Sequence, residues 1–384
     1  MRDVVVIGVG MTQFGKLTDI GLEELGRMAV WDAIKDAGID PRLIGAAYCG
    51  NVMVGKITGQ FVCCGQRILE KIGIKEIPVT NIENACASGS TAFREAWISV
   101  AAGMTDVALA FGVEKLTGTG SSPLSATGIQ TQKGAAGAIL PGIWSLRAKR
   151  HMQRFGTTLE QMAKVSVKNY KNGALNPRSQ RKEIITLEEV LGAPMVAQPL
   201  TRYQCCPVTD GAAAVILCSA DKARRYTSKP IVVAAAELGS GTYESQRDIA
   251  VDELETRVAN KAYEASGVSP KDIDLAEVHD CFTIAEIVRI EDLGLCKKGE
   301  GGRMLDEGRT EIGGDIPINA SGGLLAKGHP VAATGVAQVA EIVWQLRGEA
   351  GKRQVEDAKV GLAHCSGGEV AGDTGACTVI ILKK

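Results

Sequence analysis

The chain has 384 residues, of which 45% are hydrophobic and 23% charged, and its formal net charge is −1. This length suffices for two units with their own cores, and the near-zero charge argues against nucleic acid or an anionic membrane as the main partner. The 46 glycines and the 4% of aromatic residues favour tightly packed α/β layers over an aromatic binding platform.

The chain starts MRDVVVIGVGMTQFG, which lacks a long apolar segment with a cleavage site, so we expect no signal peptide. No apolar run reaches the ~18 residues that a membrane-spanning helix needs. The 11 cysteines show no C-x-x-C spacing. This pattern predicts reduced thiols in the cytoplasm, with neither a disulfide framework nor a metal site.

The first predicted element is a strand at residues 3–9, an apolar run bounded by glycine and therefore expected to be buried on both faces. The end of this strand overlaps the sequence GVGMTQFG. That sequence lacks the third glycine of G-x-G-x-x-G, which excludes a dinucleotide-binding loop. An amphipathic helix is predicted at about 22–37, and Gly38 closes it.

The same order of elements returns late in the chain. Residues 229–238 read as a strand, and 252–281 read as helix, glycine stop, proline turn and strand. NACASGSTAFREA (84–96) has its counterpart in the small-residue turn and alanine-rich helix of residues 319–341. We therefore predict an α/β fold made of two related halves, residues 1–228 and 229–384.

Between about residues 117 and 198 the composition changes to Gly, Ser and Thr and then to a basic stretch, RAKRHMQRFG. We interpret this segment as a loop domain inserted into the first half, over whose top it folds. Residues 210–218, DGAAAVILC, then predict a strand that returns to the first core.

Cys86 lies between a strand-like segment and a helical one, among Ala, Ser and Gly. A thiol at such a turn is near the positive end of the helix dipole, where free N–H groups favour thiolate and can bind an oxyanion. A given cysteine is usually a buried small hydrophobe, but this setting favours a nucleophile.

His329, in GHPVAATG, occupies the second half's version of the Cys86 turn. If the halves pack around a pseudo-twofold axis, the two turns face one another, and His329 can take the proton of Cys86. The alternative is a histidine that only caps a helix.

The motifs EVHDCFT and AHCSGGEVAG add three further candidates. His279 can donate to an oxyanion, while Cys281, two residues on, is expected to be a packed thiol. Cys365 precedes a Gly-Gly pair whose N–H groups are free to point at a substrate oxygen, and it can act as a second acid/base. His364 is expected to point the other way and to serve structure.

Together NACASGS, GHP and C-x-G-G resemble the thiolase superfamily, and the likeness runs from residue 3 to residue 382. The HDCF sequence, in place of N-E-A-F, is similar to the sterol-carrier-protein and archaeal types. The resemblance implies two βαβαβαββ halves in five α-β-α-β-α layers, with a loop domain inserted in the first. It also implies a homodimer or tetramer, and for the archaeal type a small zinc-ribbon/OB-fold partner protein.

The resemblance further implies transfer of an acyl group between a 3-oxoacyl-CoA and CoA, with CoA as co-substrate and no covalently bound cofactor. Cys86 matches the acylated cysteine, and His329 matches the histidine that activates it. Backbone N–H groups of Cys86 and Gly367 would bind the oxyanion, and His279 with His329 would hold the enolate. Cys365 matches the cysteine that exchanges protons with the substrate.

The sequence gives neither the acyl group, which can be acetyl, branched or aromatic, nor the direction of the reaction, and three further questions stay open. In some subfamilies the HDCF cysteine is the second acid/base, so Cys281 remains the alternative to Cys365. Arg147 and Arg150 of the inserted segment are expected to bind the CoA phosphates, unless they form only a solvated charged face. The rival functions are a condensing synthase and a catalytically silent fold that binds acyl-CoA or lipid.

Overall fold

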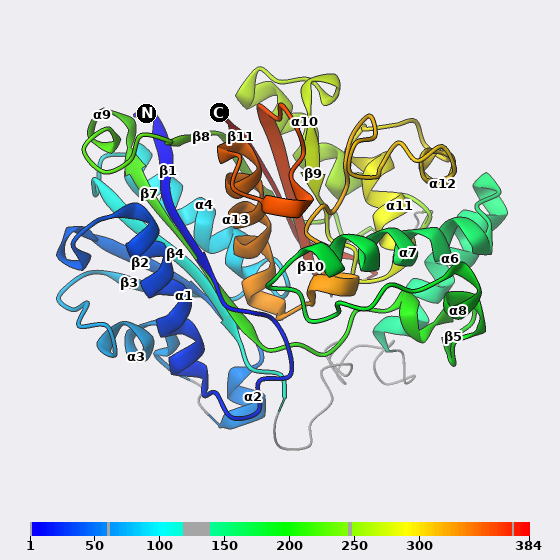
Figure 1. Ribbon diagram of the computed structural model, residues 1–384, viewed down its shortest axis with the longest axis horizontal. Coiled ribbons are helices and arrows are strands. Elements are labelled where there is room, and N and C mark those ends of the chain that lie inside the picture. The colour runs from blue at the N-terminus through cyan, green and yellow to red at the C-terminus, as the bar shows by residue number, and fades with distance from the viewer. Residues whose placement is uncertain (1, 60–61, 118–138, 245–247, 371) are drawn as a thin grey trace.

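The computed structural model describes residues 2–59, 62–117, 139–244, 248–370 and 372–384 (Figure 1). Its largest unit is a nine-stranded sheet in the order β3-β2-β4-β7-β1-β8-β11-β10-β9. The strands are β1 (Val4–Met11), β2 (Ala46–Gly50), β3 (Val79–Ile82), β4 (Val107–Glu114), β7 (Gly211–Ser219), β8 (Ile231–Gly239), β9 (Leu275–Glu277), β10 (Val360–Val370) and β11 (Asp373–Lys383).

The sheet consists of two parts, of five and four strands, which share one order of four strands: β2-β4-β7-β1 corresponds to β9-β10-β11-β8, and β3 has no counterpart in the described second part. In the first part β4 pairs antiparallel with β7 and β7 with β1, while β2 runs parallel to β4 and β3. In the second part β10 pairs antiparallel with β11 and β11 with β8, while β9 runs parallel to β10. The parts join where Val5 pairs with Val232 and Val6 with Ile231. The predicted repeat is therefore confirmed at the level of topology.

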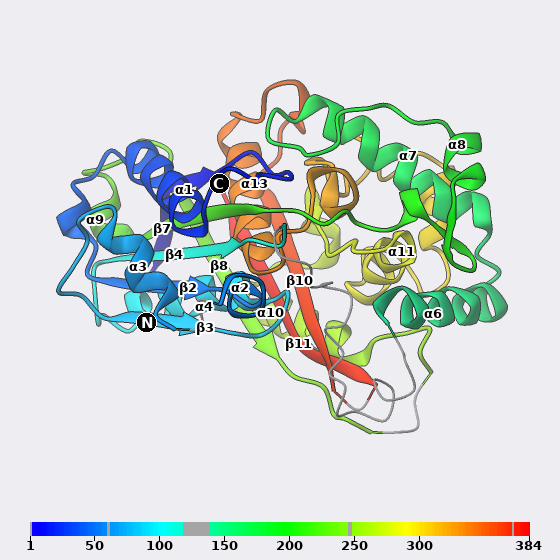
Figure 2. The ribbon, with the colours of Figure 1, turned by 90° about the horizontal axis from the view of Figure 1, so that it is seen from below.

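Helices cover both faces of each part. The main helices are α1 (Leu22–Ala37), α2 (Val54–Thr58), α3 (Cys64–Glu70), α4 (Ser88–Ala101), α6 (Leu140–Phe155), α7 (Leu159–Leu175), α8 (Leu187–Gly192), α9 (Ala220–Ala223), α10 (Glu253–Ser266), α11 (Thr283–Asp292), α12 (Gly301–Asp306) and α13 (Thr334–Arg347). Helix α1 packs on β1 and β7, and α10 packs on β8 and β11. Helices α4 and α13 pack on one another between the two parts, so five layers result (Figures 1 and 2).

The central helix layer explains the small residues of the predicted turns. All 14 residues of α13 are buried. A Cβ on Gly89 would lie 2.1 Å from the carbonyl oxygen of Ala332, and a Cβ on Gly335 would lie 2.6 Å from the Cβ of Ser90. The two equivalent turns thus approach one another so closely that only glycine fits at either contact.

The described part of the predicted insertion forms α6, α7, α8 and a small ribbon of β5 (Met195–Ala197) and β6 (Leu200–Thr201). Its residues 118–138 lie outside the described part of the chain. Helices α6 and α7 pack on α11, and α7 also packs on α12 and on the π-helical turn η5 (Gly323–Lys327). They lie on the side opposite α1 and α3 (Figures 1 and 2). Although it follows strands of the first half, this segment covers the second half.

Among the described residues, no helix combines the length and the apolar character needed to cross a membrane.

Candidate active site

The Cys86 turn connects β3 to α4 and is held by local hydrogen bonds. The hydroxyl of Ser88 donates to the carbonyl of Ala85 at 2.6 Å and accepts from the N–H of Asn84 at 2.8 Å. Ala85 has φ +48°, a value that costs free energy for a residue with a Cβ and persists only where neighbours impose it. The turn thereby places the half-buried Cys86 just ahead of the first turn of α4.

His329 lies in the equivalent turn ahead of α13 and is buried. Its backbone N–H donates to the hydroxyl of Thr209 at 3.1 Å, and its Nδ1 lies 2.7 Å from the hydroxyl oxygen of Thr334. Thr334 therefore fixes the orientation of the ring, and Nε2 is the nitrogen left to face the site.

His279 follows β9 in the second half. Its Nδ1 lies 3.3 Å from the Sγ of Cys365, and its backbone N–H donates to Nδ1 of His364 at 3.4 Å. The rings of His279 and His329 meet edge to face, with centroids 5.0 Å apart and planes at 88°. The two imidazoles consequently converge on one space.

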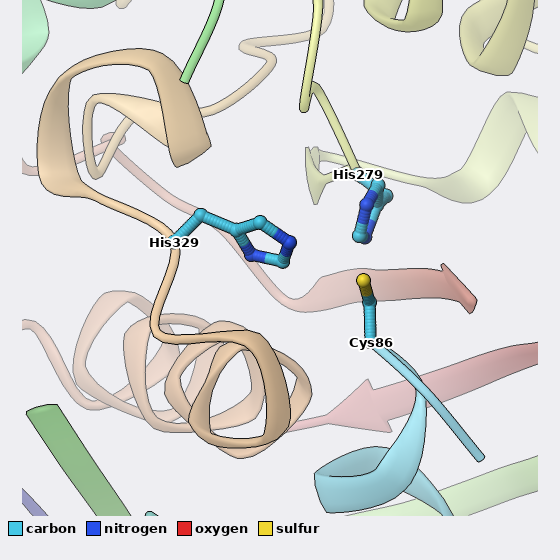
Figure 3. A group of neighbouring side chains, drawn as sticks. All are labelled: Cys86, His279 and His329. Carbon is cyan, nitrogen blue, oxygen red and sulfur yellow. The ribbon is translucent and has the colours of Figure 1, made fainter. Parts of the chain in front are cut away.

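That space also contains the thiol of Cys86 (Figure 3). One sulfur atom of Cys86 and one nitrogen atom each from His279 and His329 lie within 4.8 Å of one another. Among the described residues a second group of three such donor atoms, from Glu255, His364 and Cys377, lies equally close together, so proximity alone does not make the first trio a metal site. Three separate sequence motifs had indicated Cys86, His279 and His329.

Strand β10 runs directly past the Cys86 turn. The Sγ of Cys365 lies 3.1 Å from the carbonyl oxygen of Cys86. A Cβ on Gly367 would lie 2.5 Å from the backbone nitrogen of Cys86, which is closer than Cβ atoms come to other atoms in proteins. The glycine thus allows the backbone of β10 and the backbone of the nucleophile turn to come together.

Cys281 has a different environment, although it is close to the site. Its side chain is 8% exposed and packs in an apolar cluster with Trp144, Phe282 and Leu324. Its carbonyl accepts the N–H of Cys206 at 3.0 Å, which brings a fourth thiol near the site. Burial in this cluster raises the pKa of the Cys281 thiol. Cys206 was not singled out from the sequence, because only tertiary contact places it here.

The resting protonation states differ from the sequence-based expectation for Cys86. Burial, followed by the negative charge of Glu114, raises the pKa of Cys86 to about 12. Burial lowers the pKa of His329 to about 3, and burial together with His329 holds the pKa of His279 well below its usual range. The dipole of α4 is thus outweighed by desolvation, and the free site contains a neutral thiol and neutral imidazoles.

Glu114, at the end of β4, is a site residue that none of the sequence motifs indicated. Its buried carboxylate accepts the N–H groups of Met53 at 2.9 Å, Val52 at 3.2 Å and Ala332 at 3.4 Å. It therefore ties the loop before α2 to the turn that follows His329. Burial raises the pKa of this carboxyl to about 7. An acidic residue that ends an otherwise apolar strand was the signal available in the sequence.

His364 lies behind the site, as expected of a structural residue. Its Nε2 lies 2.6 Å from Glu255, whose other carboxylate oxygen pairs with the guanidinium of Arg289 at 3.3 Å. Arg289 also donates to the hydroxyl of Ser366 at 3.2 Å. This buried ionic group supports the strand segment that carries Cys365.

The two arginines proposed for CoA lie on α6 and are paired with acidic residues. The Nη1 of Arg147 lies 3.2 Å from Asp252, and its side chain is 11% exposed. Arg150 pairs with Asp248 at 2.7 Å near the surface. Any phosphate at these positions has to compete with a carboxylate that is already bound.

Comparison with known proteins identifies the class of this fold and site. The family model described as "Thiolase, N-terminal domain" matches residues 4–221, and the one described as "Thiolase C-terminal domain-like" matches residues 236–383. The chain belongs to the thiolase family, as the resemblance of its motifs implied.

Individual relatives narrow the activity. The chain is 47% identical to an acetyl-CoA acetyltransferase of Methanothermobacter thermautotrophicus, over 96% of this chain and 97% of that protein. Human mitochondrial 3-ketoacyl-CoA thiolase shares the fold, with a TM-score of 0.77 at 20% identity over 100% of this chain and 99% of the other. A structure described as an Ltp2-ChsH2(DUF35) aldolase has a TM-score of 0.83 at 26% identity, covering 98% and 97%. The chain is a thiolase-type acyltransferase.

Proposed function

We propose that this thiolase acts through an acyl thioester on Cys86. The observation that carries the proposal is the convergence of Cys86, His279 and His329 within 4.8 Å, with Cys365 and Gly367 against the same turn. A covalent thioester divides the difficult cleavage of a carbon–carbon bond into two easier steps. Because the free thiol is neutral, its proton has to leave during the attack.

In the first step the sulfur of Cys86 attacks the 3-oxo carbon of a 3-oxoacyl-CoA, and Nε2 of His329 takes the thiol proton. The oxyanion that forms accepts the N–H groups of Cys86 and Gly367. The imidazole of His329 is neutral at physiological pH, so its lone pair is free to accept the thiol proton.

In the second step the C2–C3 bond breaks and its electron pair forms the enolate of the departing acyl-CoA. His279 and His329 donate to the enolate oxygen, and the thiol of Cys365 gives its proton to C2. The Cys365 thiolate then takes the proton of a second CoA thiol, whose sulfur attacks the thioester carbon and displaces Cys86, and His329 returns its proton to the Cys86 sulfur. The reverse sequence is a Claisen condensation. Cys365 is favoured over Cys281 as this acid because its sulfur touches His279 and the Cys86 backbone.

We further propose acetoacetyl-CoA and acetyl-CoA as the substrates, with CoA as co-substrate and no covalently bound cofactor. Support comes from the relative named acetyl-CoA acetyltransferase, at 47% identity over nearly all of both chains. Arg147 and Arg150 are proposed to help bind the CoA phosphates, because both lie on the basic helix α6 of the inserted segment.

The remaining features of the proposal concern organisation. We propose a cytoplasmic location, which the 11 cysteines without a disulfide support. A homodimer or tetramer is proposed from the membership of the thiolase family. A small zinc-ribbon/OB-fold partner is proposed because the aldolase structure's name includes a DUF35 component. The division into residues 1–228 and 229–384 is supported by the strand order, with β8 as the first strand of the second half.

The test is mass spectrometry of the intact protein after incubation with acetyl-CoA. We expect a gain of one acetyl group, which peptide analysis assigns to Cys86 and which added CoA removes. An intact protein without adduct would favour a catalytically silent acyl-CoA-binding fold. A panel of 3-oxoacyl-CoA esters, assayed for thiolysis, then identifies the acyl group, and formation of product without thiolysis would favour a condensing synthase.

A further inference from the structure

His279 and Cys365 are in direct contact, which the separate roles given to them above do not require. The Nδ1 of His279 lies 3.3 Å from the Sγ of Cys365. Both side chains are buried, at 3% and 1% exposure, so no bulk solvent separates them. A thiol and an imidazole at this distance have the geometry of a nucleophile or acid with its own base.

The proton of the Cys365 thiol has two acceptors within reach, the carbonyl of Cys86 at 3.1 Å and the Nδ1 of His279 at 3.3 Å. If the thiol donates to the carbonyl, His279 must carry its proton on Nδ1 and turn a lone pair on Nε2 toward the substrate. A lone pair repels an enolate oxygen. If the thiol donates to Nδ1, Nε2 carries the proton and can donate to that oxygen.

We propose that His279 and Cys365 form a second cysteine–histidine pair, in which His279 is the base for Cys365 as well as a donor to the enolate. This inference rests on the proposed function and extends it. The structure would then contain two such pairs side by side, Cys86 with His329 for acyl transfer and Cys365 with His279 for proton transfer at C2.

The proton balance in the condensing direction is as follows. The Cys365 thiol gives its proton to Nδ1 of His279, which becomes an imidazolium. The Cys365 thiolate removes a proton from C2 of acetyl-CoA, and the C–H electron pair forms the C=C bond of the enolate while the carbonyl pair moves to oxygen. The positive charge on His279 strengthens the hydrogen bond from Nε2 to that oxygen. When the enolate attacks the acyl group, the imidazolium proton passes to the Cys86 thiolate that is displaced. The cleavage direction reverses each transfer.

The charged and titratable groups around the pair keep the resting proton on sulfur. His329, His364 and Arg289 face His279, and each of them disfavours a positive charge on it. Glu255 and the thiols of Cys86 and Cys281 face Cys365 and disfavour a negative charge on it. The ion pair is therefore a transient that the enolate oxygen stabilises, and free thiolate does not accumulate at physiological pH.

Deuterium exchange at C2 of acetyl-CoA, followed by NMR, tests the pair. In the natural protein the proton moves within the site, so the exchange rate should stay level between pH 7 and pH 9. A rate that rises about tenfold per pH unit in the natural protein would overturn the proposal, because it would mean that Cys365 loses its proton to solvent.

His279→Gln is the decisive variant, since the glutamine amide can donate where Nε2 did but cannot accept a proton as a base. We expect exchange at pH 7 to fall at least about 100-fold, as for loss of a general base, and to rise with pH up to 9. A fall by the same factor at every pH would show that His279 acts only as a donor and would also overturn the proposal. His151→Gln, which replaces an equally buried imidazole on α6, is the matched control and should keep the level profile.

The measurements distinguish a wrong assignment of the His279–Cys365 pair from a wrong proposed function. Acetylation of Cys86, measured by mass spectrometry on the same samples, should persist in His279→Gln. Absence of acetylation and of exchange in the natural protein would contradict the proposed function itself. Acetylation with an unchanged exchange profile in His279→Gln would contradict only the pair.

Discussion

At the scale of single residues, the site combines a thiol and imidazoles that are all neutral when no substrate is bound. A thiol with a pKa of about 12 is protected from oxidation and alkylation, because the thiolate is the reactive form. Activation then depends on the substrate, whose developing oxyanion makes proton transfer from Cys86 to His329 favourable. The burial that raises the pKa of the Cys86 thiol thus also restricts its reaction to substrates that form this oxyanion.

Replacing the nucleophile gives the first prediction. Cys86→Ser changes one atom and should leave unfolding temperature and CoA binding nearly unchanged, while thiolysis of acetoacetyl-CoA falls by several powers of ten. Steady-state kinetics and calorimetric binding of CoA are the measurements. Turnover above about a tenth of the natural value would exclude Cys86 as the acyl carrier.

The second prediction concerns the carboxylate of Glu114, whose charge raises the pKa of Cys86. Glu114→Gln removes that charge, so alkylation of Cys86 by iodoacetamide at pH 8.5 should become faster, by up to about tenfold for one pKa unit. Peptide mass spectrometry measures the rate at this residue. Glu83→Gln is the control, since Glu83 is exposed and its smaller influence is screened by solvent. Equal rates in the natural protein and Glu114→Gln would contradict the electrostatic link.

At the scale of elements, the contact between α4 and α13 determines whether the nucleophile and its base meet. Gly89→Ala would place a methyl group 2.1 Å from the carbonyl oxygen of Ala332. The helices have to separate, so we expect destabilisation of about 1–3 kcal/mol, as for overpacking, and a loss of thiolysis. Gly142→Ala on α6 meets no atom within 4 Å and serves as control.

Chemical denaturation and kinetics on the two alanine variants check this prediction. Gly142→Ala should be neutral or slightly more stable, because alanine favours the helix more than glycine does. If Gly89→Ala proved as stable and as active as Gly142→Ala, the close approach of the two turns would not matter for the site.

Much of the element structure was predictable because it depends on local signals. The helix predicted at 22–37 is α1, Leu22–Ala37, and Gly38 ends it with φ +63°, a conformation that glycine adopts without strain. The sequence repeat predicted that the Cys86 turn and the His329 turn face one another. That repeat is a long-range signal which most chains lack.

Other parts of the site could not be predicted. The raised pKa of Cys86 depends on how deeply the folded chain buries it, and no sequence pattern gives that depth. Cys206 and the His364–Glu255 pair reach the site only through tertiary packing, and the sequence shows Glu114 only as an acidic end to an apolar strand, without its partners. The covering of the second half by α6 and α7 is likewise a result of folding, since these helices follow the first half in sequence.

At the scale of the whole molecule, buried carboxyls make stability depend on pH. Burial raises the pKa of Glu114 and of Asp292 to about 7, and burial with Glu286 raises that of Asp280. In the folded protein these groups keep their protons where the unfolded chain has lost them. Their stabilising contribution is complete at low pH and is lost as the pH rises through about 7.

We therefore expect the free energy of unfolding to fall by about 2 kcal/mol between pH 6.5 and pH 8.5. His279 and His329, which are buried neutral, act in the opposite direction below pH 6.5, and their effect is smaller in this window. Urea denaturation at several pH values measures the change. Unfolding free energies that rise across this range would show that the three carboxyls are ionised in the folded protein.

The repeated turns have one consequence for symmetry. Two identical copies of the half, paired as β1 and β8 pair here, would present the same residue at both turns. In this chain one turn supplies a thiol and the other an imidazole. A dimer of two identical subunits could not place different residues at its two turns, because any substitution in one subunit would also appear in the other. A single polypeptide with two non-identical halves can place a thiol at one turn and an imidazole at the other, and the reaction needs both.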